Sequence, residues 1–434
     1  MGSVVPLFPE RAGETKGAGR RVVAALDVGS AQVACLIAEV RRGKGKSPAS
    51  ATILGHAVRA ASGVQAGVVV DMPAAERAIR LAVDAAERMA GVQVHEVWVN
   101  LSGGRPHTHT LVARLPLAGK PVTRQHMEMV AAQALADFHA GTRMVVQLVP
   151  AGYSLDDGPW IRQPEGLVGD VLAGRINVVS MSRGPLHNLE QTLQGCQLSI
   201  AGLLSAPVAA AEAVLSSDER MLGALVLDIG AAQTGWAAYQ DGMLVEAGVC
   251  PVGGQHITRD IAAGLHTPIA EAERLKTMHG SVLPGMATDE EVISVPVLGE
   301  AGPGGWQGIS RAMLHRVIVP RVEEMLEHVG RATGHLPVAV RQRVVLTGGG
   351  AQLTGLADMA ERLLNAKVRV GNVRGIGGLP PKLAAPAHAT VAGLLQAAMK
   401  PDAQGFDMAV QAEHMLQAAG GYLGRVKRWF RESF

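Results

Sequence analysis

The chain has few aromatic residues, few cysteines and little net charge. Aromatics make up 3% of its 434 residues, so helix packing must rely on small and aliphatic side chains. The three cysteines, Cys35, Cys196 and Cys250, lie far apart among apolar residues and form no C-x-x-C pair. This spacing argues against a disulfide framework or a zinc site. A net charge of +2 is too balanced to indicate a nucleic-acid-binding protein.

Long uninterrupted apolar runs are also missing. A membrane-spanning helix needs ~20 predominantly apolar residues, and the nearest candidate, Leu26–Val40, is interrupted by Asp27 and Gln32. The apolar stretch at residues 4–8 is too short for the core of a signal peptide. The hydrophobic content of 48% therefore indicates buried core, and the length predicts two or more domains.

Glycine-rich turns follow apolar strands at three places in the chain. They read Asp27-Val28-Gly29-Ser30-Ala31-Gln32, Asp228-Ile229-Gly230-Ala231-Ala232-Gln233-Thr234 and Thr347-Gly348-Gly349-Gly350. Glycine lets a backbone approach a phosphate or a base without a Cβ in the way. A carboxylate at a strand end suits Mg²⁺ near phosphates that are bound by backbone N–H groups. The order of the turns predicts a nucleotide held between two α/β halves.

Apolar periodicity predicts how these halves are built. Arg21–Leu26, Ala31–Val40 and Ala51–Arg59 are expected as strands, followed by a helix over Pro73–Met89 and a strand over Val92–Leu101. A second strand group from Leu222 repeats the order strand, D-x-G turn, strand, turn, strand, which indicates an internal structural repeat. Between the two groups, a new helix with Thr123 as its N-cap predicts a small α+β unit.

These patterns divide the chain into successive parts. We expect a disordered N-terminus at 1–20, lobe 1 at 21–102 and 183–216, an inserted α+β subdomain at 103–182, lobe 2 at 217–380 with a small subdomain at about 276–315, a helix returning to lobe 1 at 381–399, a linker at 400–419 and a terminal amphipathic helix at 420–434.

Three other patterns do not support a site. Lys44-Gly45-Lys46-Ser47 lacks the first glycine of a P-loop, and it lies between two predicted strands. His107 and His109 have no third ligand at a suitable spacing, which favours a surface polar pair over a metal site. No G-x-S-x-G elbow of a serine hydrolase is present.

The terminal segment is dense in aromatic and basic side chains. On a helix, one face holds Tyr422, Leu423, Val426, Trp429, Phe430 and Phe434, and the flanks and opposite side hold Arg425, Lys427, Arg428 and Arg431. Each basic residue near anionic lipid contributes ~1 kcal/mol, and the aromatic residues add apolar burial. The pattern predicts a helix lying on an anionic membrane surface. The alternative is a helix docked on the body of the protein.

The motifs in this order resemble the actin-like cell-division protein FtsA family. The resemblance covers Arg21 to Leu395 and the amphipathic tail, and it is carried by Gly67–Met72, Ala86–Gly91, Val252–Thr258, Ala272–Lys276 and Ala389–Leu395. It implies a two-lobed α/β fold of the actin/Hsp70 ATPase superfamily, with a small inserted α+β subdomain and a C-terminal amphipathic helix.

The resemblance also implies ATP with Mg²⁺ in the cleft. It places Asp27, Gly29, Ser30 and Gln32 in the first phosphate loop, Asp228, Gly230, Ala231, Ala232, Gln233 and Thr234 in the second, Gly253 and Gly254 close to the nucleotide, and Glu273, Lys276, Gly348, Gly349 and Gly350 around ribose and adenine. Asp27 and Asp228 would hold Mg²⁺ indirectly, together with ATP.

Members of this family polymerise and bind the C-terminal peptide of the tubulin-like protein FtsZ. They tether FtsZ to the cytoplasmic face of the bacterial inner membrane at the division septum, and later division proteins bind the inserted subdomain. The FtsZ peptide docks on the small subdomain, where Arg311, Arg316 and Arg321 would suit an acidic peptide. The alternative for these arginines is a solvated helix face.

The sequence departs from the family pattern at two places. The second loop usually reads D-x-G-G-G-T, and here Ala231, Ala232 and Gln233 replace the last three residues. Ala206 occupies the position where ATP-hydrolysing relatives often carry a glutamate before proline. Loss of a carboxylate that orients water commonly costs ~10²–10⁴-fold in rate, so we expect nucleotide binding with slow or no hydrolysis. An actin-like pilus or secretion assembly protein, and a sugar or acetate kinase, remain as alternatives.

Overall fold

The computed structural model describes residues 20–41, 50–136, 138, 141–283, 292–299 and 305–399. The predicted linker over 400–419 and the predicted amphipathic helix over 420–434 lie outside these residues. The predicted disordered N-terminus also lies outside them, apart from Arg20, with which the first strand begins.

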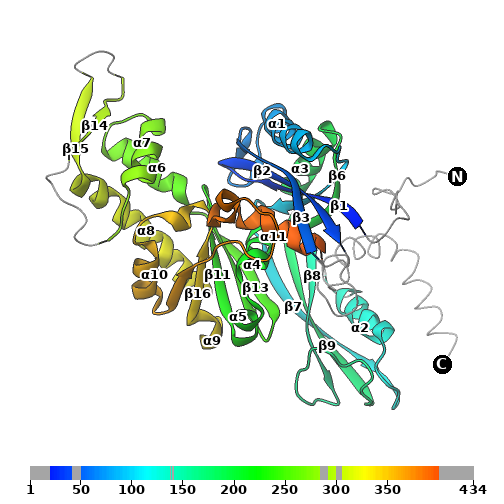
Figure 1. Cartoon of the computed structure of the whole chain (residues 1–434). Helices are drawn as coiled ribbons and strands as arrows, with labels where there is room; N and C mark the ends of the chain where they lie inside the picture. The colour runs from blue at the N-terminus through cyan, green and yellow to red at the C-terminus, as the bar shows by residue number, and fades with distance from the viewer. Residues whose placement is uncertain are drawn as a thin grey trace.

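Two five-stranded sheets carry the same strand order, and each forms the centre of one lobe (Figure 1). Lobe 1 has the order β3-β2-β1-β6-β10, and lobe 2 has the order β13-β12-β11-β16-β17. In each sheet the three strands that come first in sequence form an antiparallel meander, and the other two run parallel to the first of them. The internal repeat predicted from the sequence is therefore present in the structure.

The strands of lobe 1 are β1 (Arg20–Val28), β2 (Gln32–Arg41), β3 (Ser50–Ala60), β6 (Glu96–Leu101) and β10 (Ser199–Ser205). Those of lobe 2 are β11 (Ala224–Ile229), β12 (Thr234–Gln240), β13 (Met243–Cys250), β16 (Arg343–Thr347) and β17 (Lys367–Val370).

Helix α1 (Met72–Ala90) covers one face of the lobe 1 sheet. It begins because the Asp71 side chain accepts a hydrogen bond from the Ala74 backbone N–H, and it ends at Gly91 in the left-handed conformation. Its buried stripe is mostly alanine. A Cβ on Gly55 of β3 would lie 2.1 Å from the Ala86 carbonyl oxygen. Small side chains thus let helix and sheet touch at backbone distance, as the shortage of aromatic residues predicts.

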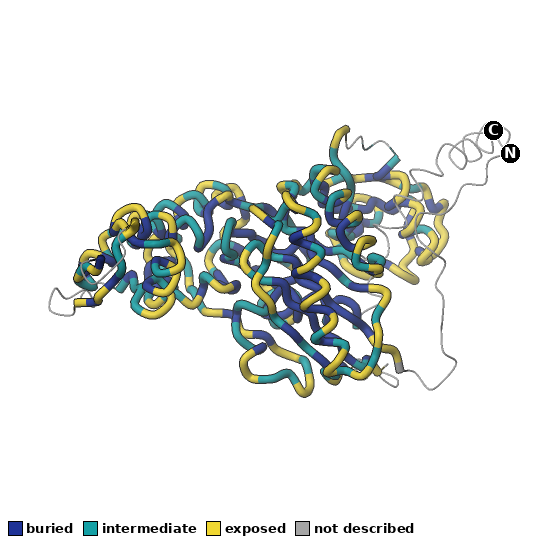
Figure 2. Tube along the Cα trace, turned by 90° about the horizontal axis from the view of Figure 1, so that it is seen from above, coloured by how far each residue is buried: buried dark blue, intermediate teal, exposed yellow. Residues whose placement is uncertain are grey.

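Helices α4 (Ala206–Val214) and α11 (Ala389–Met399) lie between the two sheets (Figure 1). They cross so closely that a Cβ on Gly393 would lie 1.6 Å from the Ala209 carbonyl oxygen. Ala224 and Val226 of β11 belong to the same hydrophobic core as α4, α11 and lobe 1, whereas Leu225 and Leu227 belong to the lobe 2 core. Buried residues accordingly run through the middle of the molecule (Figure 2).

A smaller α+β unit is inserted between β6 and α3 (Arg183–Gly195). It contains β7 (His107–Pro116), α2 (Arg124–Ala136), β8 (Arg143–Leu155) and β9 (Val171–Ser182), with strand order β7-β9-β8 and its own hydrophobic core. Thr123 Oγ1 accepts from the His126 N–H at 3.3 Å, so Thr123 caps α2 as predicted. Asn177 and Thr108 of this insert bond to the edge strand β13 of lobe 2.

The remaining elements belong mostly to lobe 2. They are α5 (Ser217–Leu222), α6 (Gly254–Gly264), α7 (Ile269–His279), β14 (Val292–Pro296), β15 (Trp306–Ser310), α8 (Arg311–Thr333), α9 (Val338–Arg341) and α10 (Leu356–Leu364), with the short β4 (Val64–Gln65) and β5 (Val68–Val69) in lobe 1 and the 3₁₀ turns η1 (Gly349–Gln352), η2 (Pro381–Ala384) and η3 (Pro386–His388). Among the described residues, no helix combines the length and apolar character needed to cross a membrane.

Candidate nucleotide site

The first two glycine turns adopt the same backbone geometry. The Gly29 N–H donates to the Gln32 carbonyl at 3.0 Å, and the Gly230 N–H donates to the Gln233 carbonyl at 3.0 Å. A Cβ on either glycine would lie 3.0–3.1 Å from that carbonyl oxygen. The second turn, with Ala231 and Ala232, therefore closes in the same way as the first, with Ser30 and Ala31.

Asp27 ends β1 and is held by a residue that the sequence analysis did not single out. Asn100 Nδ2 donates to Asp27 Oδ1 at 2.7 Å and to Ser102 Oγ at 2.8 Å, while Asn100 Oδ1 accepts from the Val28 N–H at 2.8 Å. Because β6 runs parallel to β1, its last residues come beside the end of β1. Asn100 is 1% exposed, and it fixes the orientation of the Asp27 carboxylate.

Asp228 occupies the equivalent position at the end of β11 in lobe 2. Its Oδ2 accepts from Thr390 Oγ1 of α11 at 3.4 Å. Burial, followed by the charge of Asp228, raises the pKa of Asp27 from 3.8 to about 7. Burial raises the pKa of Asp228 from 3.8 to about 6. The buried Asp27 carboxylate and the half-buried Asp228 carboxylate thus come from opposite lobes and interact, and a nearby cation would stabilise their ionised forms.

Gly253 and Gly254 lie directly beneath the second turn. The Gly254 N–H donates to the Gly230 carbonyl at 2.9 Å, and the Gln255 N–H donates to the Ala231 carbonyl at 2.6 Å. A Cβ on Gly253 would lie 2.5 Å from the Gln233 backbone nitrogen. The glycines therefore bring the start of α6 against the turn.

Glu273 and Lys276 connect α7 to α6 next to this turn. Lys276 Nζ lies 2.7 Å from Glu273 Oε2, and it donates to the Gly254 carbonyl at 3.1 Å and to Thr258 Oγ1 at 2.9 Å. Thr258 Oγ1 also donates to Glu273 Oε2. The Lys276 ammonium group is thereby fixed within reach of the second turn.

The third turn packs on the second. Gly348 has φ 81°, and a Cβ there would lie 2.5 Å from Asp228 Oδ1. The Gly348 N–H donates to the Pro386 carbonyl of η3 at 3.1 Å. A Cβ on Gly350 would lie 2.4 Å from Ile229 Cγ2. Only glycine permits this approach of β16 to the end of β11.

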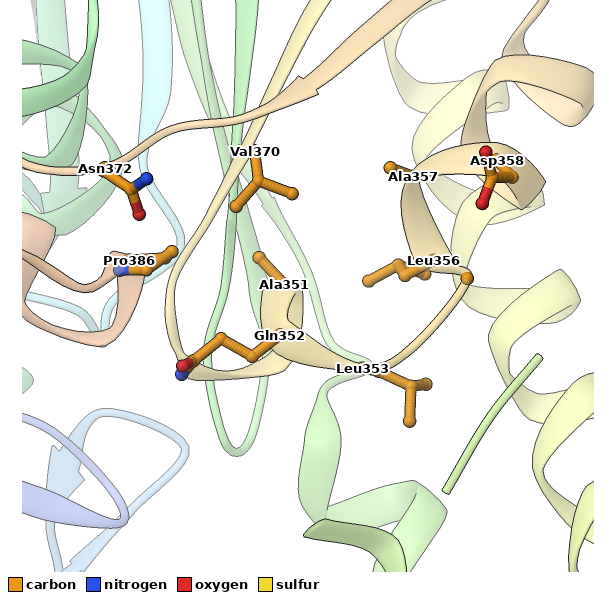
Figure 3. A pocket seen from close by; sticks show the side chains of 10 residues that line it. Ala351, Gln352, Leu353, Leu356, Ala357, Asp358, Val370, Asn372 and Pro386 are labelled. Atoms are coloured by element: carbon orange, nitrogen blue, oxygen red, sulfur yellow. The ribbon is translucent and has the colours of Figure 1, made fainter. Parts of the chain in front are cut away.

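A pocket of about 400 Å³ opens beside the third turn (Figure 3). It is lined by η1, by the start of α10 and by the chain leaving β17, and its polar side chains are Gln352, Asp358 and Asn372. The pocket does not include Asp27, Asp228 or either phosphate-loop candidate.

The predicted peptide-binding arginines have different surroundings on α8. Arg321 lies 2.5 Å from Asp260 Oδ2 through Nε and 2.5 Å from Glu324 Oε2 through Nη1, so it is already paired with two carboxylates. Arg316 is exposed, and Arg311 is half-buried. The predicted membrane-binding residues between Tyr422 and Phe434 lie outside the described residues. The rings of His107 and His109 meet edge to face with centroids 4.5 Å apart. The described residues contain no group of three or more metal-ligand side chains.

The two sheets are equivalent, and in each a D-x-G turn joins the first two strands. Two such lobes with their D-x-G turns facing one another define an actin-like fold. Solved structures agree on this fold. The "PilM-PilN type IV pilus biogenesis complex" aligns with a TM-score of 0.59 at 18% identity, over 87% of this chain and 99% of that chain. MreB5 of Spiroplasma citri bound to ADP aligns with a TM-score of 0.52 at 14% identity, over 88% and 99%.

Family comparisons are more specific than the fold. The family model "Cell division protein FtsA" matches residues 225–393, and "SHS2 domain inserted in FTSA" matches residues 103–180. Cell division protein FtsA of Rhizobium meliloti is 37% identical over 424 residues, covering 95% of each chain. The Escherichia coli K12 protein of the same name is 29% identical over 428 residues, covering 96% of this chain and all of its own length. The chain belongs to the FtsA family of cell division proteins, which confirms the resemblance in its motifs.

Proposed function

We propose that the chain binds Mg–ATP between its lobes, polymerises, and tethers the FtsZ ring to the cytoplasmic face of the bacterial inner membrane at the septum. The observation that carries the nucleotide part is the pair of interacting carboxylates, Asp27 and Asp228, at the ends of equivalent strands. Their pKa values are raised by burial, and a hydrated Mg²⁺ carried by ATP would stabilise both ionised forms.

The surrounding residues suit the rest of the nucleotide. Because the Gly29 and Gly230 N–H groups close their own turns, the backbone N–H groups that follow them, at Ser30 and Gln32 and at Ala231–Thr234, would bind phosphates. Gly253 and Gly254 keep the second loop in place. Glu273, Lys276 and Gly348–Gly350 would lie around ribose and adenine. MreB5 of Spiroplasma citri, which shares the fold, was solved bound to ADP.

Calorimetry tests this binding. Mg–ATP should bind the full-length wild type, and D27N and D228N should each weaken binding by about tenfold or more, because each removes a charge from the cation environment. D84N removes an exposed carboxylate on α1 and should leave the affinity unchanged. Equal affinities for D27N and D84N would contradict the assignment.

We also propose that hydrolysis is slow or absent. Ala206 begins α4 directly after β10 and brings a buried methyl group where a carboxylate would orient water. Gln233 uses its side-chain amide to bond the Ser102 carbonyl. A phosphate-release assay on the calorimetry sample should find bound ATP with little turnover. A rate near one per second would overturn this part of the proposal.

Membrane attachment is assigned to Tyr422–Phe434, whose basic and aromatic residues suit an anionic lipid surface. Deletion of residues 420–434 should release the protein from anionic liposomes. A W429A/F430A double variant should weaken binding less than the deletion, because the basic residues remain. Neutral liposomes are the control. Unchanged co-sedimentation of the deletion variant would contradict the anchor.

The FtsZ C-terminal peptide is assigned to the surface where the β14–β15 hairpin meets α8. Val292 and Trp306 are 64% and 59% exposed on the outer face of the hairpin, and Met313 is 44% exposed in the first turn of α8. Arg316 adds exposed positive charge one turn along. Such a surface suits a peptide that is both apolar and acidic.

The fluorescence anisotropy of a labelled peptide would measure how charge reversals at Arg316, Arg331 and Arg321 affect peptide binding. R316E should weaken peptide binding several-fold. R331E makes the same charge change at the far end of α8, on an exposed residue, and should not. R321E should act chiefly on stability, because Arg321 is paired with Asp260. Equal loss for R316E and R331E would move the peptide elsewhere. The inserted subdomain remains our candidate for binding later division proteins.

A further inference from the structure

Gln32 and Gln233 occupy equivalent positions in the two phosphate turns. In each turn the glutamine backbone carbonyl accepts the glycine N–H at 3.0 Å. The backbone of each glutamine therefore closes its own turn, and the side chain extends away from it. Both side chains reach a backbone carbonyl outside their own sheet.

Gln32 extends from lobe 1 to η3, the short turn that precedes α11. Its Nε2 donates to the Ala387 carbonyl at 3.0 Å. Ala387 lies in η3, which is anchored on the third glycine turn of lobe 2. The anchoring bonds are those from the Gly348 N–H at 3.1 Å and from Thr347 Oγ1 at 3.3 Å to the Pro386 carbonyl.

Gln233 makes the reciprocal contact from lobe 2 to lobe 1. Its Nε2 donates to the carbonyl of Ser102, just after β6. The Ser102 hydroxyl accepts from Asn100 Nδ2 at 2.8 Å, and Asn100 also holds Asp27. The acceptor of Gln233 is thus part of the network that orients the lobe 1 carboxylate.

We propose that Gln32 and Gln233 form a paired latch that holds the two lobes closed around the site. Behind the turns, α4 and α11 cross at Ala209 and Gly393 too tightly to slide past one another. A rotation of the lobes about this crossing would separate the turns. It would break the Gln233 bond to Ser102, and it would break the Gln32 bond because η3 is anchored on the third turn. The latch favours the closed arrangement before nucleotide binds, so it pre-organises the site.

The latch does not require nucleotide, whereas its effect on ATP affinity rests on the proposed function. Spin labels on R59C in β3 and M278C in α7 would report the separation of the lobes, because both side chains are exposed. The labels are placed in full-length protein in which half-buried Cys196 is replaced by serine. Distances are measured first without nucleotide for Q32A, Q233A, the double variant and Q125A, an exposed glutamine of α2 that serves as control.

Q32A and Q233A should each broaden and lengthen the distance distribution, and the double variant should do so most. Q125A should match the wild type. Q233N keeps the amide but shortens its reach, so it should behave like Q233A and covers the case in which Q233A fails to fold. Each single variant should weaken Mg–ATP binding by about two- to tenfold, the loss of one hydrogen bond.

Distance distributions for Q32A and Q233A identical to that of Q125A would overturn the latch, and so would an unchanged distribution in Q233N. Failure of wild-type protein to bind ATP would instead contradict the proposed function and leave the nucleotide-free distances as the test of the latch.

Discussion

The first and second phosphate turns have the same backbone and different neighbours. Ser30 Oγ in the first accepts from the Gly67 N–H at 3.0 Å, whereas Ala231 takes its place in the second. Asp27 is held by an amide from a neighbouring strand, and Asp228 by a hydroxyl from α11. The repeat thus determines where each carboxylate lies, and elements outside the repeat determine how it is held.

The equivalent edge strands of the two sheets, β3 and β13, also differ in what covers them. The insert covers β13 of lobe 2, where Asn177 Nδ2 donates to the carbonyls of Leu244 and Val245, and Thr108 Oγ1 accepts from the Ala247 N–H. The equivalent edge strand of lobe 1, β3, has only an isolated bridge between Thr52 and Gly377 among the described residues. A segment inserted into lobe 1 therefore protects the edge of lobe 2 and connects the two lobes.

The largest effect is expected where the two halves meet. G393A places a Cβ 1.6 Å from the Ala209 carbonyl oxygen, so α4 and α11 must separate. The free energy of unfolding should fall by about 3 kcal/mol or more, measured by urea denaturation. G184A, at the start of α3, has no atom within 4 Å of the new Cβ and should change stability by about 1 kcal/mol or less. Equal midpoints would show that the crossing is looser than its geometry indicates.

The next largest effect is expected in the pH dependence of stability, which should differ between Asp27 and Asp228. Because the folded pKa of Asp27 is raised from 3.8 to about 7, folded protein keeps a proton that unfolded protein releases, and nucleotide-free stability falls as pH rises from about 4 to about 7. D27N removes this loss, so its melting temperature should exceed that of wild type by a margin that grows over this window. For D228N, the melting-temperature difference from wild type should stop growing at about pH 6, because the folded pKa of Asp228 is about 6.

Thermal melts across this pH range provide the measurement, with exposed D84N as the control. Mg–ATP should then stabilise wild type more than D27N. A pH-independent difference between D27N and wild type would mean that Asp27 is ionised in the folded protein throughout.

An intermediate effect is expected at the covered edge of lobe 2. N177A leaves the Leu244 and Val245 carbonyls without their amide donor in a site where Asn177 is 3% exposed. Stability should fall by about 1–3 kcal/mol. Amide hydrogen exchange should accelerate in β13 and remain unchanged in β3, which serves as the internal control. Equal acceleration in both strands would show that the insert stabilises the lobes globally.

The smallest effect compares the two turns directly. S30A loses the bond from the Gly67 N–H and should cost about 0.5–1.5 kcal/mol. A231S places a hydroxyl at the same position of the second turn and should stay within about 0.5 kcal/mol of wild type. Chemical denaturation of both variants is the measurement. Similar losses would mean that the turns are equivalent in their surroundings as well as in backbone.

Most of the regular structure could be predicted from local patterns. The strands around both D-x-G turns, helix α1 and the helix capped by Thr123 lie within a few residues of their predicted positions. β10 and β17 were missed. β17 has only four residues, with Lys367 exposed, and it is a strand because β16 offers it a parallel partner. Helix α10 begins at Leu356, after the 3₁₀ turn η1 that follows the third glycine turn.

The sequence predicted the carboxylates of the candidate site but not the residues that hold them. Asp27 and Asp228 stand out because each ends an apolar run before a glycine turn. Asn100 and Thr390 carry no such signal, since they become neighbours of the carboxylates only when distant elements pack. Likewise, the sequence places Arg321 on a predicted helix but does not reveal its partner, because Asp260 lies 61 residues earlier on α6.

The sequence by itself determined the two D-x-G turns, the repeat that carries them and the family of the protein, because strand periodicity, turn chemistry and motif order are local properties of the chain. Only the tertiary structure decided that the turns bring Asp27 and Asp228 together, that Gln32 reaches η3 and Gln233 reaches Ser102 of lobe 1, and that the insert covers β13. These contacts join residues up to several hundred positions apart, and their energies arise from burial and close approach when the lobes pack together.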